Sequence, residues 1–298
     1  MITNLLVAML CLVWGTTWVV IKMGLEDSPP FLSAGLRFVI ALVVLGAIVL
    51  AKKKPHPRGR LMWWRVLFPG IFMYFIPYAA VYYASQHIPA ALNAVLFATF
   101  PFFVAVLAHF YLPGERLNVV KWLGLFGGFL GIVVIFHDGL SVPDPRVMPS
   151  MIIALLSPLA AAVASVWLKK YLTKVDSFSA TFWQMAVGVV FLLPMGFALE
   201  SLSDFRWTVN SIGAAVFLAV FGSVFTFVTY LHLLKTVEAT RLSLIAFVTP
   251  VVAVILGWIV LGESLGIETI LGGVLVLLGV YCVLVWSPRR PQKKGVAD

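Results

Sequence analysis

The feature that most constrains this chain is a motif that occurs twice, once in each half of the sequence. Each copy has a proline inside an apolar run, then a Gly-Glu-x-Leu turn, then a second apolar run with spaced glycines. Glu115 and Glu263 lie 148 positions apart, and Pro101 and Pro250 lie 149 apart. Features that recur in the same order at one spacing indicate an internal repeat. We place the two homologous halves at residues 1–148 and 149–298.

Both halves consist of apolar runs long enough to cross a membrane. Hydrophobic residues make up 62% of the chain and charged residues 11%, against roughly 45–50% and 25% in a soluble domain. A helix of about 20 residues spans the hydrocarbon core of a bilayer. The predicted helices are Leu5–Ile21, Phe31–Ala51, Val66–Ala84, Ala90–Tyr111, Val119–His137, Met151–Leu168, Ala180–Leu199, Ile212–Leu234, Leu242–Leu261 and Ile267–Trp286. The sequence predicts an all-α integral membrane protein with ten transmembrane helices.

Five helices in each half make the second half enter the membrane from the opposite side, so we expect two inverted five-helix repeats. With both termini in the cytoplasm, seventeen of the 21 Lys and Arg residues fall on the cytoplasmic side. This bias agrees with the positive-inside rule. It also explains the net charge of +9 without a nucleic-acid partner. We expect a multi-pass protein of the cell membrane, the inner membrane of a bacterium, with the lipid bilayer as a partner.

Short motifs in both halves resemble a known family. The first helix contains Trp14-Gly15-Thr16-Thr17, and the second contains Leu36-Arg37-Phe38. The two turns read Pro-Gly-Glu-Arg-Leu and Leu-Gly-Glu-Ser-Leu. Together these motifs resemble the EamA-type transporters of the drug/metabolite transporter superfamily, over nearly the whole chain.

The resemblance implies a secondary transporter that moves small organic solutes through a central cavity by alternating access. Many members of the family export amino acids or related metabolites, which makes such a small molecule the expected substrate. Others export toxic organic cations, and this alternative stays open, as does a facilitative channel. No catalytic constellation, metal-ligand spacing or nucleotide-binding loop occurs in the sequence, so we expect no enzymatic activity, no cofactor and no metal. We expect a monomer.

The Gly-Glu turns have a structural interpretation. Each glycine can adopt the left-handed conformation that ends a helix, and each glutamate then lies near the N-terminus of the next helix, where the exposed amides favour its charge. A direct role for Glu115 or Glu263 in proton coupling is the alternative.

Arg37 is the one basic residue well inside a predicted helix. Exposure of its charge to lipid would cost up to about 3 kcal/mol, so we expect it to face protein or water. It either fastens the second helix to a neighbour or binds a substrate carboxylate.

Polar and aromatic side chains in the remaining helices indicate where the substrate binds. Tyr74, Tyr78 and Tyr82 follow one another at spacings of four, which places their phenols on one helical face. We expect the site between the repeats, on the first, third, fourth, sixth, eighth and ninth helices, with Arg37 from the second. The predicted substrate-binding residues are Trp14, Thr17, Arg37, Tyr78, Tyr82, Asn93, Trp167, Gln184, Thr226 and Tyr230.

Pro101 and Pro250 are the predicted hinges. Proline removes a backbone hydrogen bond and bends a helix. Paired interruptions at corresponding depths of two repeats are typical of the moving elements of a transporter.

Overall fold

The computed structural model describes residues 2–115, 117–139, 144–262 and 267–285. Over these residues the chain is helical and contains no strand. The first repeat contains α1 (Ile2–Leu25), α2 (Pro30–Ala51), α3 (Arg60–Gly70), η1 (Ile71–Phe75), α4 (Ile76–Ser85), α5 (Ala90–Phe97), α6 (Phe100–Tyr111) and α7 (Val119–Gly139). The second contains α8 (Val147–Tyr171), α9 (Ser177–Leu199), η2 (Leu202–Asp204), α10 (Val209–Ala219), η3 (Val220–Phe225), α11 (Thr226–Leu234), α12 (Ala239–Ser243), α13 (Ile245–Leu261) and α14 (Ile267–Val285).

All ten predicted segments are helical, and the fold class is confirmed. Eight continuous or broken helices are long and apolar enough to cross a membrane, while α7 and α14 carry shorter apolar stretches. Several helices extend beyond the apolar run that predicted them. The third segment, for example, begins at Arg60 rather than Val66, because a helix continues into polar residues at the membrane surface.

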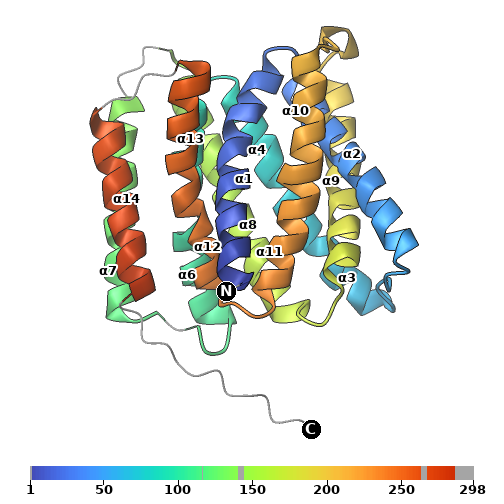
Figure 1. Ribbon diagram of the computed structural model, residues 1–298, viewed down its shortest axis with the longest axis horizontal. Helices are drawn as coiled ribbons and strands as arrows, with labels where there is room; N and C mark the ends of the chain where they lie inside the picture. The colour runs from blue at the N-terminus through green and yellow to red at the C-terminus, as the bar shows by residue number, and fades with distance from the viewer. Residues whose placement is uncertain (1, 116, 140–143, 263–266, 286–298) are drawn as a thin grey trace.

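The two repeats lie in opposite directions in one bundle (Figure 1). The α3–α4 segment of the first repeat starts at the lower end of the view, whereas the equivalent α10–α11 segment starts at the upper end. At one edge of the bundle α7 packs along α14, and towards the other edge α2 packs along α9. The first helix of each repeat contacts the other repeat, since α1 packs on α13 and α8 on α6.

A matched pair of lysines shows how closely the repeats correspond. Lys22 Nζ, near the end of α1, donates to the carbonyls of Ser85 and Ile88 at 2.7 and 3.3 Å. Lys169 Nζ, near the end of α8, donates to the carbonyls of Leu234 and Val237 at 2.7 and 2.8 Å. In each repeat, the lysine thus satisfies carbonyls that the end of the third segment leaves without a helical partner.

Interruptions in the helices also occur in pairs. A turn of π-helix separates α3 from α4 at η1, and another separates α10 from α11 at η3. The fourth segment of each repeat is broken as well, at residues 98–99 in one and at Leu244 in the other. Both breaks precede the prolines: Pro101 lies in the first turn of α6, and Pro250 lies within α13. The interruptions therefore begin before the predicted hinge residues, and Pro101 is placed where its missing N–H costs no helical hydrogen bond.

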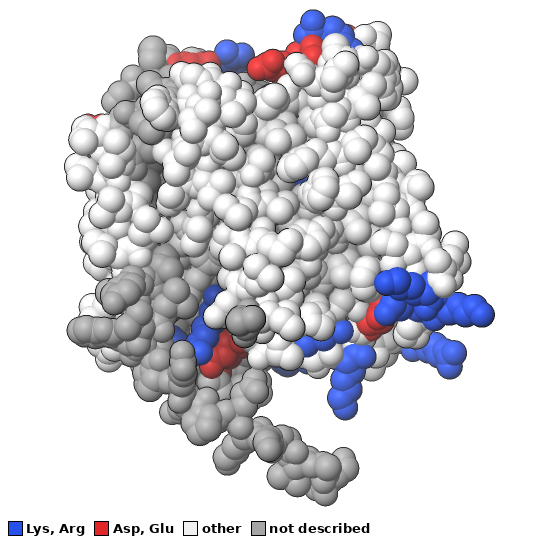
Figure 2. Space-filling view, in the orientation of Figure 1, with Lys and Arg blue, Asp and Glu red and all other residues white. Residues whose placement is uncertain are grey.

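Charged side chains gather at the two ends of the bundle and leave a broad uncharged band between them (Figure 2). Lys and Arg are concentrated at the lower end of the view. We call this the basic end; its residues include Lys52, Lys53, Lys54, Arg58, Arg60, Lys170, Lys174 and Lys235. The opposite end carries Glu26, Asp27 and Arg206.

Candidate functional site

A cavity of about 90 Å³ lies between the two repeats. Its wall comes from α1, α2, η1, α4, α5, α6, α8, α11, α12 and α13. The volume is enough for a handful of water molecules, at roughly 10–15 Å³ each. Most lining side chains are apolar or aromatic, with Arg37 as the charged one.

Arg37 projects from α2 into this wall and is 1% exposed. Its Nε donates to Ser223 Oγ at 2.8 Å, and one Nη donates to the carbonyl of Gly222 at 2.7 Å. Both acceptors belong to η3 of the second repeat, where π-helical geometry directs a carbonyl away from the regular ladder. The arginine therefore fastens the two repeats together at the cavity.

The guanidinium also lies against aromatic rings. Its central carbon is 4.8 Å from the centroid of the Tyr78 ring and 5.6 Å from that of Phe38. The hydroxyls of Tyr78 and Tyr82 accept from it at 3.4 and 3.5 Å, which are long hydrogen bonds. None of the ion pairs among the described residues involves Arg37. The guanidinium is therefore surrounded by hydrogen-bond acceptors and aromatic faces, and no carboxylate of the described residues pairs with it.

An aromatic wall continues from Arg37 across the cavity. The ring of Tyr78 lies 6.3 Å from Phe227, and Phe227 lies 5.6 Å from Trp14. Trp14 in turn lies 5.5 Å from Tyr230, whose hydroxyl donates to Ser165 Oγ at 3.0 Å. The cavity thus has a cation at one side, hydroxyls at another and rings between them.

Five of the ten predicted residues meet at this cavity: Trp14, Thr17, Arg37, Tyr78 and Tyr230. Thr17 lines it while its hydroxyl bonds to the carbonyl of Trp14 at 2.7 Å.

The other five predicted residues do not line the cavity. Tyr82 is fully buried behind Tyr78, and Asn93 donates to the carbonyl of Val81 and to Ser85. Thr226 bonds to the carbonyl of Gly222 within its own helix. Trp167 and Gln184 lie further away: Trp167 Nε1 donates to the carbonyl of Arg65, and the backbone of Gln184 lies against Gly70. Helical spacing groups residues on one face of a helix, but it does not tell which neighbour that face meets.

Among the lining residues that were not predicted, two carry polar atoms without a partner in the described residues. Trp18 Nε1 and Ser157 Oγ are buried and have no hydrogen-bond partner within the part of the chain that the structure describes. Both side chains line the cavity, so a polar group of a substrate can bind them. Trp18 follows the Trp-Gly-Thr-Thr motif directly, which is the signal that could have identified it. Ser157 has no such signal, because a serine in an apolar helix most often bonds its own backbone, as Ser165 does to Ala161.

The glycines of both turns adopt the left-handed conformation that was predicted, with φ of 89° at Gly114 and 65° at Gly262. The partner of Glu115 was predicted wrongly. Its carboxylate accepts from the amides of Ala239 and Thr240 at 2.9 and 3.1 Å, at the start of α12 in the other repeat rather than of α7. The N-terminus of α7 is instead capped by Asn118. Glu263 lies outside the described residues.

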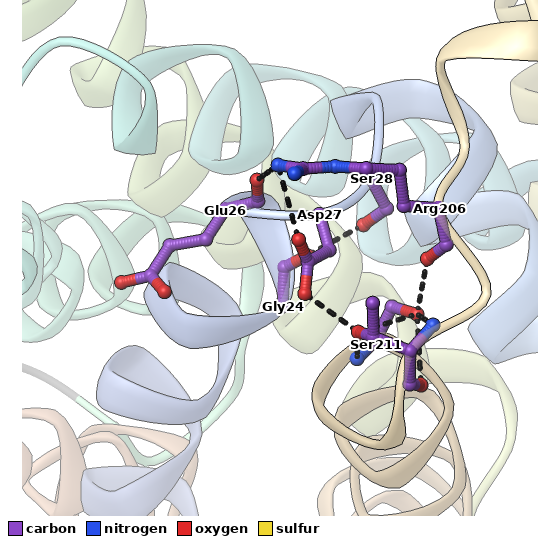
Figure 3. A network of polar contacts seen from close by, with 7 residues as sticks. Gly24, Glu26, Asp27, Ser28, Arg206 and Ser211 are labelled. Atoms are coloured by element: carbon purple, nitrogen blue, oxygen red, sulfur yellow. Dashed lines mark hydrogen bonds and ion pairs between the residues drawn. The ribbon is translucent and has the colours of Figure 1, made fainter.

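Polar contacts join the repeats at both ends of the bundle. At the end opposite the basic end, Arg206 pairs with Asp27 at 3.1 Å and donates to the carbonyl of Glu26 at 2.7 Å (Figure 3). Thr208 adds a hydrogen bond of 2.6 Å to Asp27, and Ser211 holds the carbonyl of Arg206 at 2.7 Å. These contacts link the α1–α2 loop with the start of α10.

At the basic end, Lys54 pairs with Asp176 at 3.0 Å, which links the α2–α3 loop with the start of α9. Burial raises the pKa of the Asp176 carboxyl, but the amide of Ser179 and the ammonium of Lys54 lower it by more, so the pKa lies below its ordinary value. Polar contacts therefore connect the two repeats at both ends of the bundle in this conformation.

Comparisons with known proteins agree with this architecture. The model of the EamA-like transporter family matches the chain twice, at residues 1–137 and 148–285. Similar proteins include the uncharacterized transporters YoaV (29% identical, 94% of this chain and 95% of YoaV) and YvbV (30%, 98% and 93%) of Bacillus subtilis. The uncharacterized inner membrane transporter YedA of Escherichia coli K12 is 29% identical over 97% of this chain and 92% of its own. A crystal structure with a TM-score of 0.76 and 20% identity covers 96% of this chain and 99% of its own, which shows the shared fold.

Proposed function

The chain belongs to the EamA-like transporter family, and we propose that it is a secondary transporter that exports an amino acid or a related zwitterionic metabolite. The direction of transport rests on the family resemblance. The substrate class rests on the cavity, and above all on Arg37.

The observation that carries the proposal is a buried guanidinium that lines a cavity and has no acidic partner among the described residues. A charge removed from water is costly unless it is paired. A substrate carboxylate would supply the missing counterion and form charge-assisted hydrogen bonds with the guanidinium. The same positive charge disfavours a substrate that carries only a cation.

The aromatic wall suits the rest of a zwitterion. An ammonium group over the face of Trp14 or Tyr230 gains roughly 0.5–2 kcal/mol. Trp18 Nε1 and Ser157 Oγ offer unpaired polar atoms at the same cavity. The modest volume of the cavity favours a small solute.

Alternating access would require the repeats to separate at one end while staying in contact at the other. The paired π-turns and helix breaks next to the cavity, together with Pro101 and Pro250, are the places where such bending would occur. The substrate would then meet Arg37 from either side in turn.

We place the basic end in the cytoplasm of a bacterial inner-membrane protein, since Lys and Arg favour that side. A cysteine at position 53 should resist a membrane-impermeant thiol reagent in intact cells, and one at position 144 should react. Labelling at position 53 from outside would contradict this orientation.

An organic cation is the second candidate, because the wall of rings around the cavity also suits an ammonium group. Binding by the purified protein separates the two. We expect a panel of amino acids to bind more tightly than the corresponding amino acid amides, which lack the carboxylate.

With the same panel, the Arg37→Gln variant should lose this preference, and the Tyr78→Ala variant should bind every ligand more weakly. If a quaternary ammonium binds the wild type and no amino acid does, the zwitterion proposal is wrong. If Tyr78→Ala leaves every affinity unchanged, the substrate binds elsewhere.

A further inference from the structure

A second concave site, separate from the central cavity, lies between α3, α6 and α8. It has a volume of about 310 Å³ and is lined by aromatic and aliphatic side chains, with Lys170 as its charged member. The two sites share no lining residue. On α8, Ala161 and Ser165 face the central cavity, while Val163 and Trp167 face the groove, which places the two sites on opposite sides of this helix.

The two repeats differ at two pairs of equivalent positions beside the groove. Gly24 follows Lys22 by two residues, and Tyr171 follows Lys169 by two residues. At Gly24, a Cβ would lie only 3.0 Å from Cβ of Ala214, so α1 and α10 pack closely. At the other end of the bundle the equivalent contact is between Tyr171 and Arg65, whose guanidinium lies 5.0 Å from the ring centroid. Two large side chains take the place of two small ones, and α8 packs less closely on α3 than α1 does on α10.

The end of the groove at the basic end carries two cations. Lys170 Nζ lies 5.7 Å from the ring centroid of Tyr111 and 5.4 Å from that of Tyr171. Arg65 lies on the same tyrosine. Neither cation takes part in an ion pair within the described ranges. Tyr111 is 56% exposed and Lys170 is exposed as well, so the groove opens on the outer surface of the bundle, where lipid would surround it.

We propose that this groove binds an anionic phospholipid of the cytoplasmic leaflet, with an acyl chain against Phe68, Leu107 and Val163 and the phosphate between Lys170 and Arg65. The apolar wall matches an acyl chain, and the cations match a headgroup phosphate at the depth of the membrane surface. Trp167 holds the groove in shape through its 3.0 Å hydrogen bond to the carbonyl of Arg65. The bound lipid fills the space between α8 and α3. At the opposite end of the bundle, close packing of Gly24 and Ala214 leaves no such space between α1 and α10.

Native mass spectrometry of the purified full chain, titrated with phosphatidylglycerol or phosphatidylcholine, tests the proposal. We expect the wild type to prefer phosphatidylglycerol. The double variant Arg65→Gln/Lys170→Gln should lose roughly 30-fold in affinity for this lipid, the effect of two cations near a headgroup. The matched control Lys53→Gln/Arg60→Gln removes two exposed cations from the same end that neither line the groove nor lie on Tyr171, and it should bind as the wild type does.

A second variant keeps the charges and fills the space. Leu107→Trp places a larger side chain in the groove and should also lower the affinity for phosphatidylglycerol. Equal affinity of the wild type and both groove variants would overturn the proposal, as would an equal loss in the control pair.

The competing occupant is the transported solute on its way to the basic end. Transport in vesicles of phosphatidylcholine alone distinguishes the two. We expect the Arg65→Gln/Lys170→Gln variant to match the wild type there, because no anionic lipid is present for either protein. A variant that still transports more slowly in these vesicles would show that the groove belongs to the transport path.

Discussion

Arg37 in the first repeat and Gln184 in the second occupy equivalent places, each seven residues after its helix begins. Arg37 lines the cavity and bonds to η3 across the repeat boundary. Gln184 is equally buried, but it does not line the cavity; its backbone lies against Gly70 of α3, and its Nε2 has no partner in the described residues. The duplicated architecture is therefore shared, whereas the charge at the site comes from one repeat.

A second contrast concerns how closely the helices pack at the two ends of the bundle. The small pair Gly24 and Ala214 lets α1 and α10 pack closely, while the larger pair Tyr171 and Arg65 goes with a looser packing of α8 on α3. If the contacts of the two inverted repeats were identical, the two ends of the bundle would be equivalent. The two contrasts show that the repeats share a fold but differ in two respects: one repeat supplies the charge at the cavity, and the two ends of the bundle pack differently.

The largest expected effect is that of Arg37. Arg37→Gln removes the counterion for the substrate and should lower transport of an amino acid roughly 30- to 150-fold, or about 2–3 kcal/mol. The equivalent change Gln184→Ala should alter transport much less, because Gln184 does not line the cavity. Initial rates in proteoliposomes at equal protein content measure both. Comparable losses in the two variants would remove the contrast between the repeats.

The second-largest effect is expected at the contact of Gly24 with Ala214. Gly24→Leu overfills a contact in which even a Cβ would lie 3.0 Å from Ala214, so the free energy of unfolding should fall by about 1–3 kcal/mol. Tyr171→Leu at the equivalent position removes a half-buried cation–π contact and should cost about 1 kcal/mol or less. Reversible denaturation in mixed micelles gives both values. A larger loss for Tyr171→Leu would show that the separated end is the more tightly packed one.

The smallest effect distinguishes two glutamates that cap helices of the opposite repeat. Glu115 holds the start of α12, and Glu200 holds the amides of Phe31 and Leu32 at 2.8 Å each. Glu115→Gln should lower the free energy of unfolding by about 1–2 kcal/mol.

Glu200→Gln should cost less, because burial raises the pKa of the Glu200 carboxyl and the two amides only partly offset this. A carboxyl whose pKa is higher in the folded protein is relatively more stabilising in its protonated form, so the contribution of Glu200 should decrease as the pH rises through that pKa. Denaturation of the wild type and of Glu200→Gln between pH 4 and 7 measures the difference. An opposite pH trend would contradict the inferred burial of this charge.

Much of the fold could be predicted from the sequence, because long apolar runs and a repeated Gly-Glu turn restrict a chain to few arrangements. The site could be predicted in part. Arg37 and Tyr78 were found because a charge or a row of phenols in an apolar helix must face protein or water. Asn93 and Gln184 obey the same rule, yet they face other helices.

Contacts between the repeats could not be predicted from the sequence. Glu115 was expected to cap the helix that follows it, but the inverted arrangement brings α12 of the other repeat closer. Ser157 gave no signal, since its unpaired hydroxyl is a property of the assembled cavity. Only the packing of the helices decides which polar atoms remain free for a substrate.

The central claim is that the two repeats alternate around one site, and counterflow in proteoliposomes tests it most directly. Vesicles loaded with an unlabelled amino acid should accumulate the labelled one transiently above its external concentration, because a carrier exchanges one molecule for another. Arg37→Gln should abolish this overshoot while Gln184→Ala retains it. Equilibration of the label without an overshoot would indicate a channel and would contradict the account.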